Sequence, residues 1–146
     1  NWMTTSDALN LFVDMYDDFD LNKALSLMER MDIEKKVKIK ELSKGMKEKF
    51  QLILVMSRKA KIYILDEPLG GIDPAARELI LDTILNNYAE DALVLLSTHL
   101  IADIEKIFDE VIFIKNGEII LHENSEDLRM KRQASINDIF KEEFKC

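Results

Sequence analysis

The sequence of 146 residues is 47% apolar and carries a formal net charge of −8, which fits one ordered globular domain and argues against nucleic acid or an anionic membrane surface as a direct partner. A single cysteine, Cys146, excludes a disulfide framework within the chain and a zinc site built from cysteines, as suits a reducing compartment. No apolar stretch approaches the ~20 residues that cross a membrane, and no signal peptide is visible, so we expect any membrane association to depend on a partner.

The first third of the chain is predicted to be helical. Thr5 or Ser6 can cap a first helix and Asp20 a second, because each precedes apolar residues at helical spacing. Residues 35–40 form a charged connector, which we interpret as a solvated turn. Ser43 is expected to open a third helix.

Two short apolar runs, residues 61–65 and 92–97, are predicted to be strands. An apolar run without alternation is typical of a strand buried on both faces. Between the runs, Asp73 and Pro74 form an N-cap and first-turn pair, so a helix is expected to follow them.

The last third of the chain combines a hairpin with helices. The dipeptide Asn116-Gly117 between two apolar runs is a strong signal for a two-residue hairpin turn. Ser125 can cap the helix that follows, and an amphipathic pattern marks the final one. In chain order we expect a short helix, the two hairpin strands and two more helices, over residues 101–108, 111–114, 118–121, 125–129 and 135–144.

Two adjacent carboxylates, Asp66 and Glu67, directly follow the first apolar run. The carboxyl ends of parallel strands are where open α/β sheets bind their ligands. At such a place one acid can hold a hydrated metal ion and the next can take a proton from water. Taken alone, the run is equally compatible with a strand that merely ends in solvated charge.

Three further segments resolve this ambiguity. They are Leu42-Ser43-Lys44-Gly45-Met46 before the acids, Gly70-Gly71-Ile72-Asp73-Pro74 after them, and Ser97-Thr98-His99 at the end of the second run. Together with the acidic run, and in this order and spacing, they resemble the signature motif, Walker B strand, D-loop and switch histidine of the ATP-binding subunit of ABC transporters, its nucleotide-binding domain. The resemblance extends over roughly residues 2–128.

Two motifs of that family are missing from the sequence. A Walker A loop needs Gly-x-x-x-x-Gly-Lys-Ser/Thr to cradle phosphates, and none of the four glycines is followed by lysine. The glutamine loop is absent as well. We therefore expect a C-terminal fragment of such a subunit that begins just after the glutamine loop, and we expect the fragment by itself to be inactive.

The resemblance implies an α/β fold, a partial P-loop NTPase core of parallel strands plus a terminal hairpin, preceded by the helical signature subdomain. The expected division is residues 1–58 for the helical subdomain, 59–122 for the partial core and 123–146 for C-terminal helices. The family's Walker A strand lies between the strand ending near His99 and the strand 111–114. Without it, residues 93–96 would offer an apolar edge, so either the chain self-associates or these two strands pair directly.

The resemblance also implies catalytic roles at the carboxyl ends of the strands. Asp66 would hold Mg²⁺ through its water shell, and Glu67 would polarise the water that attacks ATP. His99 would donate a hydrogen bond to the γ-phosphate. A lone histidine at a strand end is otherwise usually just a polar terminus, and His122, which lacks such a context, is interpreted as a surface residue.

The remaining site residues are implied to act across a dimer. Ser43 and Gly45 would contact the γ-phosphate held by the opposite subunit, although Ser43 can equally be a plain N-cap. The sequence departs from the commonest signature, Leu-Ser-Gly-Gly-Gln, at Lys44 and Met46, which we interpret as a subfamily feature. Asp73 would connect the two nucleotide sites and serve as an N-cap as well.

These expectations describe the ATP-binding and ATP-hydrolysing subunit of a bacterial, exporter-type ABC transporter, with ATP and Mg²⁺ as cofactors. Its expected partners are a second ATPase subunit and a transmembrane permease subunit, with no nucleic acid. It would be cytoplasmic and peripheral to the inner face of the cell membrane through the permease. The alternatives are an isolated non-catalytic interaction module, or a soluble ABC ATPase not linked to transport.

Overall fold

The computed structural model describes residues 2–144, so Cys146 lies outside the described residues. The chain forms two compact units, one ending at Thr98 and the other beginning at His99. The division into three parts at residues 58 and 122 stays a prediction. The fold class is confirmed: helices come first, then a parallel strand pair and a terminal hairpin.

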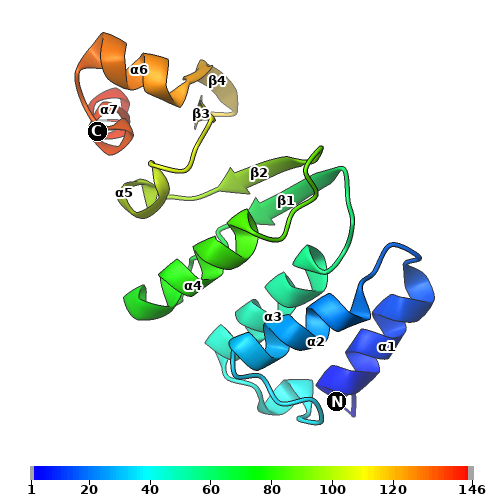
Figure 1. Ribbon diagram of the computed structural model, residues 1–146. Coiled ribbons are helices and arrows are strands. Elements are labelled where there is room, and N and C mark those ends of the chain that lie inside the picture. Colours follow the sequence, from blue (N-terminus) through cyan, green and yellow to red (C-terminus); the bar gives the residue numbers. More distant parts are fainter. Residues whose placement is uncertain (1, 145–146) are drawn as a thin grey trace. The chain divides into compact units, whose positions relative to one another are not determined.

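The first unit contains four α-helices, one 3₁₀ helix and two strands among the described residues (Figure 1). These elements are α1 (Thr5–Met15), α2 (Leu21–Arg30), η1 (Ile39–Glu41), α3 (Lys44–Met56), β1 (Ile62–Asp66), α4 (Pro74–Leu85) and β2 (Leu93–Ser97). The predicted N-caps of α2, α3 and α4 are confirmed, because the side chains of Asp20, Ser43 and Asp73 each accept a backbone N–H from the first turn. The 3₁₀ turn of η1 occupies the end of the connector that we interpreted as a solvated turn.

The predicted cap of α1 is wrong by one residue. Thr4, not Thr5 or Ser6, is the N-cap: its hydroxyl accepts the Asp7 N–H at 3.2 Å, and its own N–H donates to the Asp7 carboxylate at 2.8 Å. Thr5 is fully buried and donates its hydroxyl to the carbonyl of Glu34 at 2.7 Å. Several neighbouring residues are suited by type to be the N-cap of α1. The reciprocal capping box of Thr4 and the tertiary hydrogen bond of Thr5 decide which of them takes that position.

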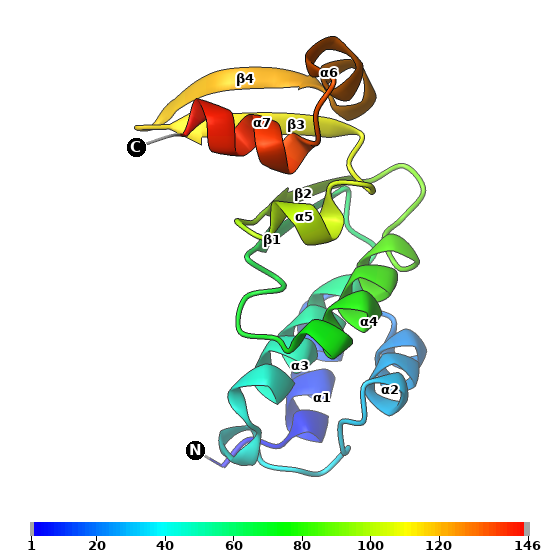
Figure 2. The same ribbon diagram turned by 90° about the vertical axis from the view of Figure 1, so that its left-hand side faces the viewer.

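Strands β1 and β2 pair in parallel, from Ile62 opposite Leu93 to Asp66 opposite Ser97. Helices α3 and α4 lie below these strands in both views (Figures 1 and 2). One face of β1 is buried through Tyr63 and Leu65, and the Tyr63 hydroxyl donates to the carbonyl of Arg58 at 2.6 Å.

The other face of this sheet corrects the expectation that its strands are buried on both faces. Its large apolar side chains are 47–71% exposed, so these strands are not buried on both faces; the residues are Ile62, Ile64, Leu93 and Leu95. Helices pack against only one side of this strand pair, so only that face of the sheet is covered. Of the two alternatives for the apolar edge, direct pairing of β2 with the strand at 110–115 is not found in the described chain, since the two strands belong to different sheets. Self-association stays a prediction.

The second unit holds α5 (Ile101–Ile104), β3 (Glu110–Lys115), β4 (Glu118–Asn124), α6 (Ser125–Arg132) and α7 (Ile136–Glu143). The hairpin prediction is confirmed: Asn116 and Gly117 have φ of 54° and 81°, the positive values that a two-residue turn needs. The strands run further than expected and contain a bulge, since Phe113 pairs with Leu121 and Ile114 with Ile119.

The core of the second unit lies against one face of β3. Val111 and Phe113 pack with apolar residues of α5, α6 and α7, namely Ile101, Leu128, Ile136 and Ile139. The cap of α6 is Asn124 and not Ser125, because the Asn124 side chain accepts two backbone N–H groups. Ser125 is buried and donates its hydroxyl to the carbonyl of Phe108.

Within residues 2–144, no helix combines the length and the apolar character that a membrane span requires.

Candidate functional site

Asp66 ends β1 and is paired in register with Ser97, which ends β2. Because the strands are parallel, their carboxyl ends lie side by side, and the Ser97 hydroxyl donates a hydrogen bond to Oδ1 of Asp66. Asp66 is exposed. Its carboxylate is therefore oriented by the neighbouring strand while remaining accessible to a ligand.

Glu67 follows with a left-handed backbone, at φ of 47°, which is uncommon for a residue other than glycine. Its N–H donates to the carbonyl of Ser97 at 3.0 Å, and its carboxylate accepts the Thr98 hydroxyl at 3.4 Å. The backbone thus turns sharply between the two acids, and the two carboxylates take different hydroxyl donors. Backbone strain of this kind is concentrated at functional sites.

The loop after the acids is tightly constrained by its two glycines. The Gly70 N–H donates to the carbonyl of Glu67 at 2.9 Å, and a Cβ on Gly70 would lie 3.1 Å from that oxygen. Gly71 has φ of 72°, and a Cβ there would lie 3.4 Å from Lys44 Nζ and 3.5 Å from Glu48 Oε1. The loop after β1 therefore passes directly over the first turns of α3.

The start of α3 carries the two predicted phosphate contacts. The Ser43 hydroxyl accepts the Met46 N–H at 3.2 Å, so its capping role is established. A Cβ on Gly45 would meet nothing within 4 Å, so the space beside this residue is open. Backbone N–H groups at a helix N-terminus suit an anion. The role of Ser43 and Gly45 toward phosphate stays a prediction.

Asp73 is confirmed as an N-cap, since its carboxylate accepts the N–H groups of Ala75 and Ala76, both at 3.1 Å. Arg77 donates from Nε to the carbonyl of Ile72 at 3.3 Å and so fixes the end of the glycine loop. A second role of Asp73 in a dimer stays a prediction.

His99 begins the second unit and is exposed, and its catalytic role also stays a prediction.

The oxygens near Asp66 suit Mg²⁺ better than a metal held by protein ligands alone. Within the described residues, no group of three or more His, Cys, Asp or Glu side chains could hold a metal ion. Asp66 and Ser97 offer one carboxylate and one hydroxyl, and Mg²⁺ typically takes one or two carboxylates and completes its shell with water and phosphate. The donor set fits such an ion bound together with a nucleotide.

Sequence reasoning missed the partners of the predicted residues. Ser97 and Thr98 were identified only as neighbours of His99, yet their hydroxyls contact the two carboxylates. A usable signal was present: two short apolar runs with polar residues at their carboxyl ends imply that those polar residues lie together if the strands pair in parallel. No local signal indicated that Lys44 and Glu48 lie beside Gly71.

A family model described as "AAA domain, putative AbiEii toxin, Type IV TA system" matches residues 11–102. Among curated proteins, the chain is 30% identical over 117 residues to the ABC transporter ATP-binding protein YtrB of Bacillus subtilis, which covers 80% of this chain and 40% of that protein. It is 34% identical over 97 residues to the Nod factor export ATP-binding protein I of Rhizobium meliloti, covering 65% and 29%. The chain thus spans less than half the length of these relatives.

Solved structures give the same result for the fold. A structure titled "Structure of ATP binding subunit of ABC transporter" superposes with a TM-score of 0.83 at 26% identity. The match covers 96% of this chain and 62% of that chain. Almost the whole chain therefore matches a part, under two thirds, of that ATP-binding subunit.

Proposed function

The chain belongs to the matched AAA-domain family and to the ATP-binding proteins of ABC transporters, and on that basis we propose that it supplies the water-activating half of an ATP-hydrolysing site. The observation that carries the proposal is the convergence of Asp66, Glu67, Ser97 and Thr98 at the carboxyl ends of two parallel strands. Ligands of open α/β sheets bind at this end.

Within this site Glu67 is the general base. Its carboxylate takes a proton from the water that attacks the γ-phosphate, a contribution typically worth ~10²–10⁴-fold in rate. The Thr98 hydroxyl orients the carboxylate. When bound beside Asp66, Mg²⁺ would neutralise charge on the phosphates. Asp66, oriented by Ser97, would hold the ion's water shell.

The other predicted residues act on phosphate across a dimer. Ser43 and Gly45 present the N-terminus of α3 to the γ-phosphate of ATP bound to a second ATPase subunit, and the open space beside Gly45 leaves room for it. His99 donates a hydrogen bond to the same phosphate. Asp73, which caps the helix that follows the glycine loop, connects the two sites.

Transport is the proposed use of this hydrolysis. The relatives are named as transporter and export ATP-binding proteins, which supports an exporter-type role. The chain would then lie on the cytoplasmic face of the membrane, attached through a permease subunit. By itself it would be inactive, because its sequence has no Gly-x-x-x-x-Gly-Lys-Ser/Thr loop.

The test uses a protein in which this chain follows a segment with that phosphate-binding loop. ATP hydrolysis is measured for the intact protein, for Asp66→Asn and for the matched surface control Asp14→Asn. We expect Asp66→Asn to lose hydrolysis and Asp14→Asn to retain it. Hydrolysis that is equal in all three proteins would refute the role of Asp66, and its absence in all three would favour a non-catalytic interaction module.

A further inference from the structure

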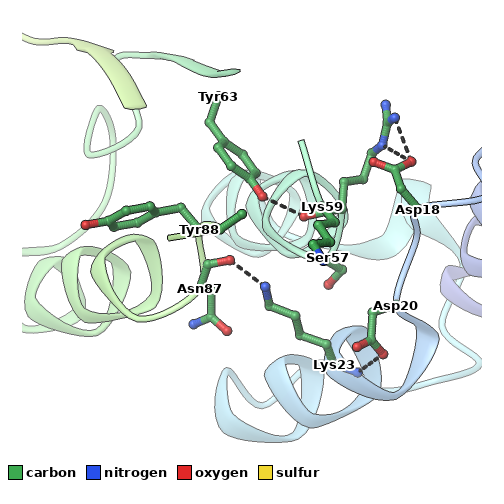
Figure 3. A pocket seen from close by; sticks show the side chains of 10 residues that line it. Asp18, Asp20, Lys23, Ser57, Lys59, Tyr63, Asn87 and Tyr88 are labelled. Atoms are coloured by element: carbon green, nitrogen blue, oxygen red, sulfur yellow. Dashed lines mark hydrogen bonds and ion pairs between the residues drawn. The ribbon is translucent and has the colours of Figure 1, made fainter. Parts of the chain in front are cut away.

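A cavity of about 230 Å³ lies in the first unit (Figure 3), and none of the predicted ATPase residues is among those that line it. It is formed where the start of α2, the end of α3 and the segment after α4 meet. Residues on its wall include Asp20, Lys23, Ser57, Lys59, Tyr63 and Tyr88. The proposed hydrolytic site makes no use of it.

Lys23 reaches across this cavity from α2. Its Nζ donates a hydrogen bond to the carbonyl of Asn87 at 2.5 Å, just beyond the end of α4 (Figure 3). Its nearest acid along the helix, Asp20, uses its carboxylate to cap α2 by accepting the Lys23 backbone N–H at 2.9 Å. Across residues 2–144 no ion pair to the Lys23 ammonium is found, so a neutral carbonyl is its hydrogen-bond acceptor.

The surroundings disfavour the charged form of this amine. Burial lowers the pKa of Lys23, and the attraction of Asp20 offsets this only in part. The other charged groups on the cavity wall are Lys59, which is also cationic, and Arg58, which is paired with Asp18 at 2.8 Å. Relative to an ordinary lysine, Lys23 therefore holds more neutral amine at a given pH.

Lys131 provides the opposite case within the same chain. Its ammonium is exposed and bonded to the Glu123 carboxylate at 2.5 Å. That hydrogen bond raises the pKa of Lys131. Because the neutral amine is the nucleophile, the two lysines should differ in reactivity toward electrophiles, in favour of Lys23.

We propose that Lys23 is an acylation site of this protein, modified by small acyl donors with a good leaving group, such as acyl phosphates and acyl thioesters. Neutral Nζ attacks the carbonyl carbon and forms a C–N bond. The C–O or C–S bond to the leaving group breaks, phosphate or thiolate departs with the electron pair, and the nitrogen releases its proton to water. The cavity is several times larger than the ~30 Å³ that one water occupies in the liquid, so an acetyl group has room.

Acylation would alter the polar connection between α2 and α4. Two basic side chains of α2 make this connection: Lys23 through the Asn87 carbonyl, and Arg30 through an ion pair with Asp82. The acyl-lysine loses its charge and all but one N–H. Arg30 and Asp82 would then remain as the charged link to the helix that begins at the glycine loop.

The experiment treats the folded 146-residue chain with limiting acetyl phosphate and quantifies the acetylation rate at each lysine by mass spectrometry. We expect Lys23 to react several-fold faster than Lys131. Asp20→Asn should accelerate Lys23 further and leave Lys131 unchanged, because asparagine caps a helix as well as aspartate does but carries no charge. In denaturing urea the preference should vanish.

Three results would overturn the proposal. One is a Lys23 rate no higher than that of Lys131 in the folded chain. Another is a slower or unchanged Lys23 rate in Asp20→Asn. The third is a preference for Lys23 that persists in urea, since that would trace the reactivity to local sequence and not to the cavity.

Discussion

Asp66 and Ser97 lie directly opposite each other at the ends of β1 and β2, and the serine hydroxyl donates a hydrogen bond to the aspartate carboxylate. The next residue, Glu67, donates its N–H to the Ser97 carbonyl at 3.0 Å. One serine on the neighbouring strand therefore positions both acids. The geometry of the carboxylates depends on strand pairing and not only on the order Asp-Glu in the sequence.

The first prediction concerns Glu67, the proposed general base. In a protein that joins this chain to a phosphate-binding loop, Glu67→Gln should reduce ATP turnover by about 10²-fold or more while ATP still binds, because the amide is nearly isosteric but cannot accept a proton. Steady-state phosphate release and nucleotide binding are measured side by side. Glu90→Gln, an exposed change outside the helices and strands, is the control. Unchanged turnover in Glu67→Gln would exclude this carboxylate as the base.

The second prediction concerns the 146-residue chain alone. Calorimetry with MgATP should detect no binding tighter than the millimolar range, about −4 kcal/mol, because its sequence has no Walker A lysine and no nest of backbone amides for the phosphates. Micromolar affinity would show that the described residues form a complete nucleotide site by themselves.

A third prediction compares two glycines by urea denaturation. Gly71→Ala should lower the free energy of unfolding by about 1–3 kcal/mol, because its φ of 72° strains an L-residue, while its Cβ would make only ordinary van der Waals contacts with Lys44 and Glu48. Gly45→Ala is the matched control: its Cβ meets open space within a helix, so stability should stay equal or rise by up to about 1 kcal/mol. Equal effects at the two positions would contradict the described loop geometry.

The fourth prediction follows from the exposed apolar face of β1 and β2, formed by Ile62, Ile64, Leu93 and Leu95. The chain should self-associate, since burying a large apolar side chain is worth about 1.5–3 kcal/mol and the edge of β2 can recruit another strand. Light scattering should give a mass above that of one chain. Ile64→Thr combined with Leu95→Thr should shift the mass toward the monomer.

Val13→Thr is the control for that experiment, because Val13 is 42% exposed on α1 and lies outside the sheet. It should leave the mass unchanged. A wild-type chain that is monomeric at every concentration tested would refute self-association, and an equal effect of the control would refute the role of the sheet face.

A fifth prediction concerns acid stability. The hydrogen bond from Arg58 lowers the pKa of Asp18 from its ordinary value of 3.8. The folded state thus holds this proton less tightly than the unfolded state, so the stabilisation is complete above about pH 3.8 and is lost as pH falls through the lowered pKa. Asp18→Asn should be less stable than wild type at pH 7, with the difference shrinking at acid pH. A difference independent of pH would contradict the pairing with Arg58.

Much of the local structure could be predicted because it depends on few neighbouring residues. The caps at Ser43 and Asp73, the strand that ends in Asp66 and the turn at Asn116-Gly117 each follow from side-chain chemistry within a few positions. The caps at Thr4 and Asn124 were missed by one residue, because Thr5 and Ser125 compete for the same role and are instead drawn into tertiary hydrogen bonds.

The sequence by itself determined the family, the order of helices and strands, and the identity of the two acids, since these depend on motifs and on apolar periodicity along the chain. Only the tertiary structure decided which hydroxyls orient Asp66 and Glu67, how Gly71 meets Glu48, and where Lys23 finds its acceptor. These contacts join residues 31, 23 and 64 positions apart. Their partners depend on strand register and helix packing, which no short stretch of sequence specifies.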